Sequence, residues 1–295
     1  MSVLGYGKIL KIYNSLYEVF DPKSLNTQTC HKQKKIEHLV VGDDVIFDSN
    51  GGKGNIVEVK PRKNMLTHPC IANVDVVFYI SALKNPEYKL YQIDLFLAYL
   101  FSLNIKAKLV FTKKDLVHQD GFKDLGFYAS LGFEPLFLNS LDLKPEEKKQ
   151  IHEEIKNKVI VFAGGSGVGK STLLKNLSMN INVKTDEISR KTLKGKQTTK
   201  QVSLYCLDSH KTFIADTPGF SFFDESLFKQ IDLTRGFPEF QTLAAQCRFS
   251  NCSHQEEPDC SIKQAAEKKL IKKSRYDSYR MLYSQLEKIK KRCDY

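Results

Sequence analysis

The chain of 295 residues has no segment suited to crossing a membrane and no export signal. An apolar stretch such as residues 95–103 is far shorter than the roughly 20 residues that a membrane-spanning helix needs. The start MSVLGYGKIL lacks the cationic, apolar and small-residue segments of a signal peptide. We therefore expect a cytoplasmic protein with no membrane partner.

Internal repeats and low-complexity segments are also absent, and the seven cysteines are an odd number. Without an export signal, a framework of disulfides is not expected. The hydrophobic fraction of 41% and the charged fraction of 27% are ordinary for a folded soluble protein. The length allows two or three domains, each with its own core.

Acidic residues are outnumbered by basic ones, 34 against 45, which gives a formal net charge of +11. A basic excess favours a polyanionic partner such as nucleic acid, although a solvated surface can be basic without binding anything. Residues 1–67 contain short β segments separated by Gly, Asn and Asp, which indicates a small barrel of the OB type. Such barrels often bind oligonucleotides, but the segment could equally be a scaffold.

Residues 68–222 alternate between apolar strands and helical segments, as expected for a doubly wound α/β sheet. Strands are predicted near 74–80, 108–111, 136–138, 159–163, 202–207 and 212–215. Residues 223–295 have no predicted strand and form a third, α-rich part with a basic helical tail at 265–292. Apolar residues at helical spacing in this tail, Tyr279 among them, predict a face that packs on its own domain.

Residues 164–171 read GGSGVGKS, a complete phosphate-binding loop after the apolar strand VIVFA. Glycines let the backbone amides turn toward phosphate oxygens, and the following helix adds its positive end. Lys170 is expected to reach the outer phosphates and the Ser171 hydroxyl to ligate Mg²⁺. The predicted phosphate contacts are Gly164, Gly165, Ser166, Gly167, Val168, Gly169, Lys170, Ser171 and Thr172.

The segment TKKD, from Thr112 to Asp115, closes a predicted strand and resembles the guanine-specificity element NKxD. A carboxylate there can accept hydrogen bonds from N1–H and the N2 amine of guanine, a pair that adenine lacks. The stem of Lys113 can cover the purine face. Thr112 stands where Asn is usual, which leaves the supporting contact to the loop open.

A third element, DTPG, runs from Asp216 to Gly219 and resembles the DxxG motif. In that motif the Asp holds Mg²⁺ through water, and the Gly donates its N–H to the γ-phosphate. Thr198 is the candidate switch threonine of the Mg²⁺ shell, although its surroundings could be a plain connection. The guanine element precedes the phosphate loop, whereas ordinary GTPases have the reverse order. The GTPase domain is therefore predicted to be circularly permuted, which a site built from loops at one sheet edge allows.

Cys247, Cys252, His254 and Cys260 follow the pattern C-x4-C-x-H-x5-C. Three thiolates and an imidazole are a suitable tetrahedral set for one structural Zn²⁺. With all four positions filled, no place is left for a catalytic water. The alternative is that these cysteines are scattered by chance.

Together these features resemble the RsgA (YjeQ) family of bacterial ribosome-biogenesis GTPases over nearly the full length. The matching segments are VVGDDV at 40–45, PRKN at 61–64, ANVD at 72–75, TKKD, GGSGVGKS, KGKQTT at 194–199, DTPGF and the cysteine cluster. The family commonly has His before the Thr pair, where this chain has Gln197.

The resemblance implies that the chain hydrolyses GTP to GDP and that the small (30S) ribosomal subunit stimulates this reaction. It further implies that the barrel and the zinc domain contact rRNA. It also implies a monomer that assists late maturation of that subunit. Phe220 follows DTPG where many GTPases have a water-orienting Gln, so turnover by the chain alone is expected to be slow. Two rivals stay open: a P-loop ATPase or kinase, and an RNA-binding scaffold that holds nucleotide without turnover.

Overall fold

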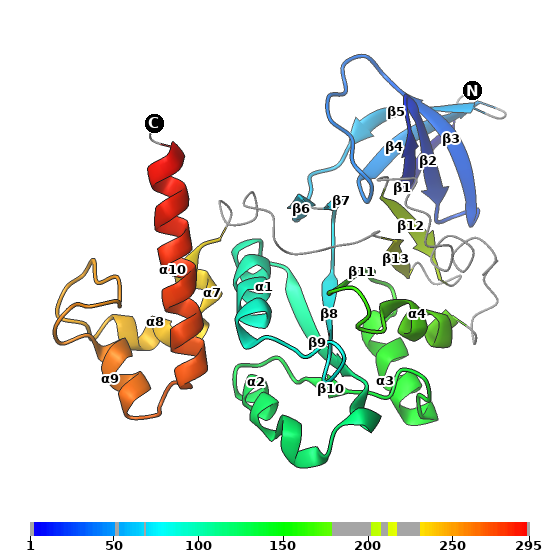
Figure 1. Ribbon diagram of the computed structural model, residues 1–295. Helices are drawn as coiled ribbons and strands as arrows, with labels where there is room; N and C mark the ends of the chain where they lie inside the picture. Colours follow the sequence, from blue (N-terminus) through cyan, green and yellow to red (C-terminus); the bar gives the residue numbers. More distant parts are fainter. Residues whose placement is uncertain are drawn as a thin grey trace.

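The computed structural model describes residues 3–50, 53–67, 69–178, 202–207, 212–216 and 231–293. Figure 1 shows a β-barrel at the N-terminus, a central sheet with flanking helices, and a helical unit at the C-terminus. Within these ranges, no helix combines the length and the apolar character needed to span a membrane.

The N-terminal part is a closed barrel whose strands follow the order β1-β2-β3-β5-β4. Its strands are β1 (Val3–Tyr13), β2 (Leu16–Asp21), β3 (Asn26–Lys32), β4 (Asp44–Asn50) and β5 (Lys53–Val59). Ile9, Val19 and Phe47 are fully or almost fully buried in its core. The predicted barrel is confirmed. Strand β3 has a weak sequence signal, because in NTQTCHK only Cys30 is buried and apolar residues do not alternate with polar ones.

The chain leaves the barrel through a junction built from three short segments. Asp43 is buried and accepts hydrogen bonds from Arg62 Nε at 2.6 Å and from the Val40 amide at 2.8 Å. Asn64 and Val74 exchange two hydrogen bonds, of 2.8 and 2.9 Å. The segments VVGDDV, PRKN and ANVD therefore fix how the barrel continues into the sheet. The hairpin of β6 (Met65–Thr67) and β7 (Cys70–Ala72) lies between them.

The central sheet has the order β10-β9-β8-β11-β13-β12, and only β12 runs antiparallel to its neighbour. Its strands are β8 (Val76–Ala82), β9 (Lys106–Thr112), β10 (Leu136–Phe137), β11 (Val159–Ala163), β12 (Ser203–Cys206) and β13 (Phe213–Asp216). All seven residues of β8 are buried, as expected for a central strand covered on both faces.

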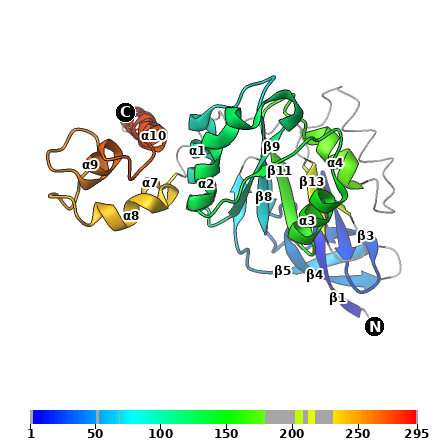
Figure 2. The ribbon, with the colours of Figure 1, turned by 90° about the horizontal axis from the view of Figure 1, so that it is seen from below.

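Alternate residues of β8 belong to two separate cores. Val77 and Tyr79 pack on the face covered by α1 (Leu90–Ser102), whereas Phe78 and Ile80 pack on the opposite face. The second face is covered by α3 (Pro145–Ile155) and α4 (Lys170–Ser178). Figure 2 shows these helices on opposite sides of the sheet, with α2 (Phe127–Ser130) beside α1. The doubly wound sheet predicted from the sequence is confirmed.

The C-terminal part is helical. It contains α7 (Leu233–Gly236), α8 (Pro238–Ala244), α9 (Ser261–Glu267) and α10 (Lys273–Cys293). The helical tail predicted over residues 265–292 consists of two helices, because the chain turns between α9 and α10. Lys269 is left-handed with φ 60°, and the Leu270 amide returns to the Ala265 carbonyl at 2.8 Å, which ends α9. The face of α10 that contains Tyr279 packs within the α1-side core.

A buried arginine joins this helical part to the sheet domain. Arg275 on α10 is 1% exposed and binds Asp94 of α1 at 2.7 Å and Glu239 of α8 at 2.7 Å. Its guanidinium also lies 4.3 Å from the ring centroid of Phe237. The Tyr128 hydroxyl donates to the same Asp94 carboxylate at 2.8 Å. The two carboxylates hold the pKa of Arg275 above its ordinary value despite burial, so the group stays charged.

We expect Arg275→Met to lower the free energy of unfolding by about 3–5 kcal/mol, because the buried Asp94 carboxylate loses the cation that pairs with it. Arg280→Met, on the same helix but half-exposed and paired with the exposed Glu256, is the control and should cost less than about 1 kcal/mol. Denaturant unfolding of both variants measures the difference. Equal losses would contradict the structural role given to Arg275.

Candidate nucleotide site

The loop at residues 164–169 connects β11 to α4, and its glycines are required by its geometry. Gly164 has φ +144°, and a Cβ placed there would lie 2.0 Å from the Ile80 carbonyl oxygen. Gly167 and Gly169 also have positive φ, of 74° and 93°. The backbone therefore curls in a way that larger residues do not allow. Because α4 begins directly after it, the loop lies at the positive end of a helix.

The Lys170 ammonium reaches back over this loop. Its Nζ donates to the Gly164 carbonyl at 2.8 Å and also to the Gly165 carbonyl. Burial lowers the pKa of Lys170, and within the described residues both hydrogen bonds of its ammonium go to backbone carbonyls. A partly desolvated cation held only by carbonyls is suited to an anionic ligand that would supply the missing negative charge.

Thr112 supports the loop from behind. It is fully buried at the end of β9, and its hydroxyl donates to the Val168 carbonyl at 2.6 Å. The supporting contact that the sequence left open is thus present with threonine. The Val168 side chain is itself buried in the core on the α4 side. Thr112 and Val168 therefore shape the loop rather than line the cavity in front of it.

The next residues of TKKD turn outward into that cavity. Lys113 is left-handed with φ 58°, and its ammonium donates to the Asn85 carbonyl. Asp115 lies in the short 3-10 turn η1 (Lys114–Leu116) and is exposed. The Lys114 amide donates to the Leu138 carbonyl at 3.2 Å, which ties this turn to the end of β10. The carboxylate of Asp115 is thus presented to solvent by a fixed backbone.

The segment after β10, residues 139–141, forms a further part of the cavity wall. The Asn176 side chain of α4 donates to the Ser140 carbonyl at 2.6 Å, and Asn139 accepts from the Leu141 amide at 3.1 Å. The Ser140 hydroxyl is buried and has no hydrogen-bond partner among the described residues. Other atoms of Ser140 contribute to the cavity wall. Leu141 is 77% exposed at the same rim.

One pocket of about 840 Å³ joins these elements, a volume suited to a nucleotide-sized ligand. Its lining residues are Asn85, Lys113, Asp115, Leu116, Asn139, Ser140, Leu141, Gly164, Gly165, Ser166, Gly167, Gly169, Lys170, Ser171 and Thr172. Residues more than 50 positions apart in sequence therefore form one site. Asn85, Leu116 and Leu141 were not predicted, because no motif contains them and only the packing of the loops reveals them.

Two of the other predicted site residues, Thr198 and Gly219, lie outside the described residues, as does Gln197. Asp216 is the last residue of β13 and is opposite Ser203 of β12. Strand β13 is parallel to β11, so Asp216 and the phosphate loop follow strand ends at the same edge of the sheet. The order of motifs expected of a permuted domain is therefore compatible with a single site edge.

A second cluster lies in the C-terminal part. The ligand atoms of Cys247, Cys252, His254 and Cys260 are all within 4.8 Å of one another. Cys247 Sγ and Cys260 Sγ are 4.0 Å apart, and His254 Nδ1 lies 3.6 and 3.5 Å from these two atoms. A tetrahedral site with metal–sulfur bonds of about 2.3 Å has sulfur–sulfur edges of about 3.7 Å. The cluster can therefore hold a metal ion.

The loops of this cluster are held by side chains of α10 and by one carboxylate. Tyr276 donates to the His254 carbonyl at 2.9 Å, and Tyr279 donates to the Ser253 carbonyl at 3.0 Å. Glu257 accepts from the Ser253 amide at 2.6 Å and from the Gln255 amide at 3.0 Å. The cluster is thus fixed to the helix that carries Arg275.

We expect Thr112→Val to weaken nucleotide binding, because the Val168 carbonyl loses its buried donor while the shape of the side chain is kept. The free energy of unfolding should fall by about 1–3 kcal/mol. Thr29→Val, at an exposed position of the barrel, is the matched control. Calorimetric titration with GTP and denaturant unfolding measure both effects. Unchanged affinity and stability would show that this hydrogen bond does not support the loop.

Comparison with known proteins agrees with this geometry. Residues 59–226 match the family model described as RsgA GTPase. The "Small ribosomal subunit biogenesis GTPase RsgA" of Malacoplasma penetrans is 34% identical, over 95% of this chain and 98% of its own length. The protein of the same name from Streptococcus pneumoniae is 35% identical, over 95% of this chain and 94% of its own.

Solved structures of nearly full length are also similar. The crystal structure of YloQ, described as a circularly permuted GTPase, has a TM-score of 0.78 and is 28% identical, covering 97% of this chain and 96% of its own. YjeQ from Thermotoga maritima has a TM-score of 0.77 and is 27% identical, covering 96% of this chain and 99% of its own. The motifs, the fold and these relatives together show that the chain belongs to the RsgA family of GTPases.

Proposed function

We propose that this chain hydrolyses GTP to GDP and phosphate while it assists the maturation of the small (30S) ribosomal subunit. The observation that carries the proposal is that the phosphate loop and Asp115 line one pocket. A phosphate site and a carboxylate suited to guanine in one cavity together fit GTP. The relatives named small ribosomal subunit biogenesis GTPase supply the cellular setting.

Within the pocket we assign roles by chemistry. Asp115 accepts from the guanine edge, and the stem of Lys113 lies along the purine. Backbone amides from Gly164 to Thr172 hold the phosphates, and Lys170 neutralises the outer ones. Thr112 and Val168 act through the shape of the loop.

Ser171 and Thr198 are the proposed Mg²⁺ ligands, with Asp216 acting on the ion through water and Gly219 donating its amide to the γ-phosphate. Mg²⁺ supplies charge stabilisation on the phosphates when it is bound. Lys170 and the loop amides stabilise charge on the leaving diphosphate. Phe220 has no group that could orient a water, so hydrolysis by the chain alone is slow. The small subunit then supplies the orientation of the attacking water that Phe220 cannot provide.

We divide the chain into an OB-type barrel at 1–67, a permuted GTPase domain at 68–222 and a zinc domain at 223–295. The barrel and the basic zinc domain contact rRNA, for which the net charge of +11 is suited. We propose that the protein acts as a cytoplasmic monomer.

The cluster of Cys247, Cys252, His254 and Cys260 binds one Zn²⁺. We therefore expect elemental analysis to find about one zinc per chain. Cys252→Ala should abolish zinc retention and lower the unfolding temperature, because the short loops around it have little core of their own. Cys70→Ala, an exposed cysteine outside the cluster, is the control. Full stability of Cys252→Ala after chelation would contradict a structural metal.

The function is tested by GTP hydrolysis with purified small subunits, with large subunits and with neither. We expect a strong rise in turnover with small subunits alone. Asp115→Asn should weaken GTP binding about tenfold or more, since an amide cannot accept both guanine donors. Asp142→Asn, an exposed carboxylate outside the pocket, is the control. Equal rates under all three conditions would refute the proposal, and single-turnover inactivity on the subunit would favour a scaffold.

A further inference from the structure

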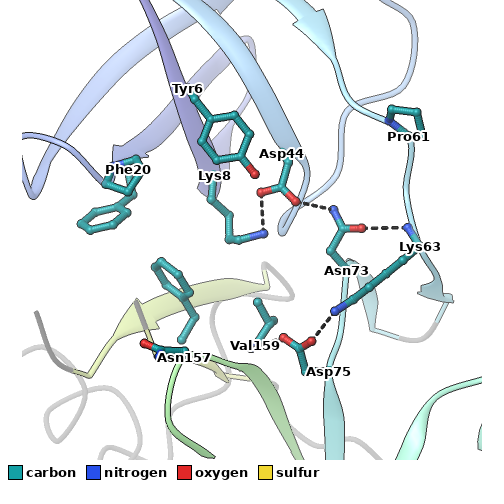
Figure 3. Close-up of a pocket in the computed structure, with 12 residues that line it drawn as sticks. Tyr6, Lys8, Phe20, Asp44, Pro61, Lys63, Asn73, Asp75, Asn157 and Val159 are labelled. Carbon is teal, nitrogen blue, oxygen red and sulfur yellow. Dashed lines mark hydrogen bonds and ion pairs between the residues drawn. The ribbon is translucent and has the colours of Figure 1, made fainter. Parts of the chain in front are cut away.

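A second cavity lies far from the nucleotide pocket, between the barrel and the opposite edge of the sheet (Figure 3). Its volume is about 390 Å³, and both the barrel and the sheet contribute to its wall. Tyr6, Lys8 and Phe20 come from β1 and β2. Val159 and Phe213 are the first residues of β11 and β13. The cavity is therefore at the amino ends of strands whose carboxyl ends form the nucleotide site.

The polar side of this cavity is electrically balanced. Lys8 binds Asp44 at 2.7 Å, and Lys63 is paired with Asp75. The Asn73 amide donates to Asp44 at 3.2 Å. Figure 3 shows these groups along one side of the cavity. Two cations paired with two carboxylates favour neither a free anion nor a free cation. They offer donors and acceptors to a neutral polar ligand.

The other side of the cavity is aromatic. Phe20 and Phe213 meet edge to face with ring centroids 5.4 Å apart. Tyr6 is 44% exposed, and its hydroxyl points to Asp44 (Figure 3). Tyr6 is neutral at physiological pH, as tyrosines ordinarily are, and burial and the Asp44 charge raise its pKa further, to about 12. An exposed neutral ring beside a polar edge suits a flat heterocycle that stacks and forms hydrogen bonds at once.

Two exposed lysines are sequence neighbours of residues in the cavity wall. The exposed Lys23 follows Pro22, and the exposed Lys156 precedes Asn157, and both Pro22 and Asn157 line the cavity. A neutral interior with lysines outside it matches the charge distribution of a nucleotide within a strand, in which the base is neutral and the phosphates are anionic.

We propose that this cavity binds one unpaired nucleobase of an RNA strand, with Tyr6 as its stacking partner and the flanking phosphates near Lys23 and Lys156. The inference rests on the proposed contact of the barrel with rRNA, but it is independent of the assignment of the nucleotide pocket, since the two cavities share no residue. Strands β8, β11 and β13 separate the two sites, so the base and GTP bind at the same time.

The test uses the full chain and the single-stranded RNA heptamer UUU-(2-aminopurine)-UUU, with 2-aminopurine riboside as the free-base probe. Stacking quenches 2-aminopurine fluorescence, so titration gives the affinity for each probe. Tyr6→Ala should weaken binding of the heptamer about tenfold. Tyr13→Ala is the matched control, because Tyr13 is on the same strand, is 46% exposed and does not line the cavity. GTP affinity, measured on the same samples, should be unchanged in both variants.

Quenching that saturates, is lost in Tyr6→Ala and is kept in Tyr13→Ala and with saturating GDP supports the proposal. Tight binding of the free riboside, equal to that of the heptamer, would keep the nucleobase site but overturn the assignment to a strand. Equal effects of the two tyrosine variants, or no quenching at all, would overturn the site itself. Failure of GTP binding in the wild-type chain would instead refute the proposed GTPase function and leave this result unaffected.

Discussion

The nucleotide site depends on a close approach between two backbones. At Gly164 the phosphate loop passes so near to β8 that a Cβ would lie 2.0 Å from the Ile80 carbonyl oxygen. From the other side, the hydroxyl of Thr112 at the end of β9 donates to the Val168 carbonyl. The loop is therefore fixed between two neighbouring strand ends. Because TKKD follows β9 directly, the same strand that supports the loop also brings Asp115 to the pocket.

The other two parts are attached to this domain by buried polar contacts. Asp43 and Arg62 fix the passage from barrel to sheet, and Arg275 fixes α10 to α1 through Asp94. Such contacts are costly to break, because each would leave a buried charge without its partner. The barrel and the Cys/His cluster thus have defined positions relative to the pocket.

The elements best predicted from the sequence are those with local signals. GGSGVGKS and the cysteine spacing each specify chemistry within a few residues, and the strands β8 and β11 are uniformly apolar. What could not be predicted depends on distant partners. The residues of β3 are mostly polar and show no alternation of apolar and polar side chains. The end of α9 depends on the left-handed backbone conformation of Lys269. The motifs at 40–45, 61–64 and 72–75 were informative only as a family likeness, until the contacts of Asp43 and Asn64 gave them a physical reason.

The same pocket is proposed to bind both the guanine base and the phosphates of GTP. Equilibrium titration of the unmodified chain with GTP and with ATP, each with Mg²⁺ and under the same conditions, measures this selectivity. GTP should bind at least about tenfold more tightly, because adenine leaves the Asp115 carboxylate without its donors. Equal affinity for the two nucleotides, or tighter binding of ATP, would mean that Asp115 does not select guanine.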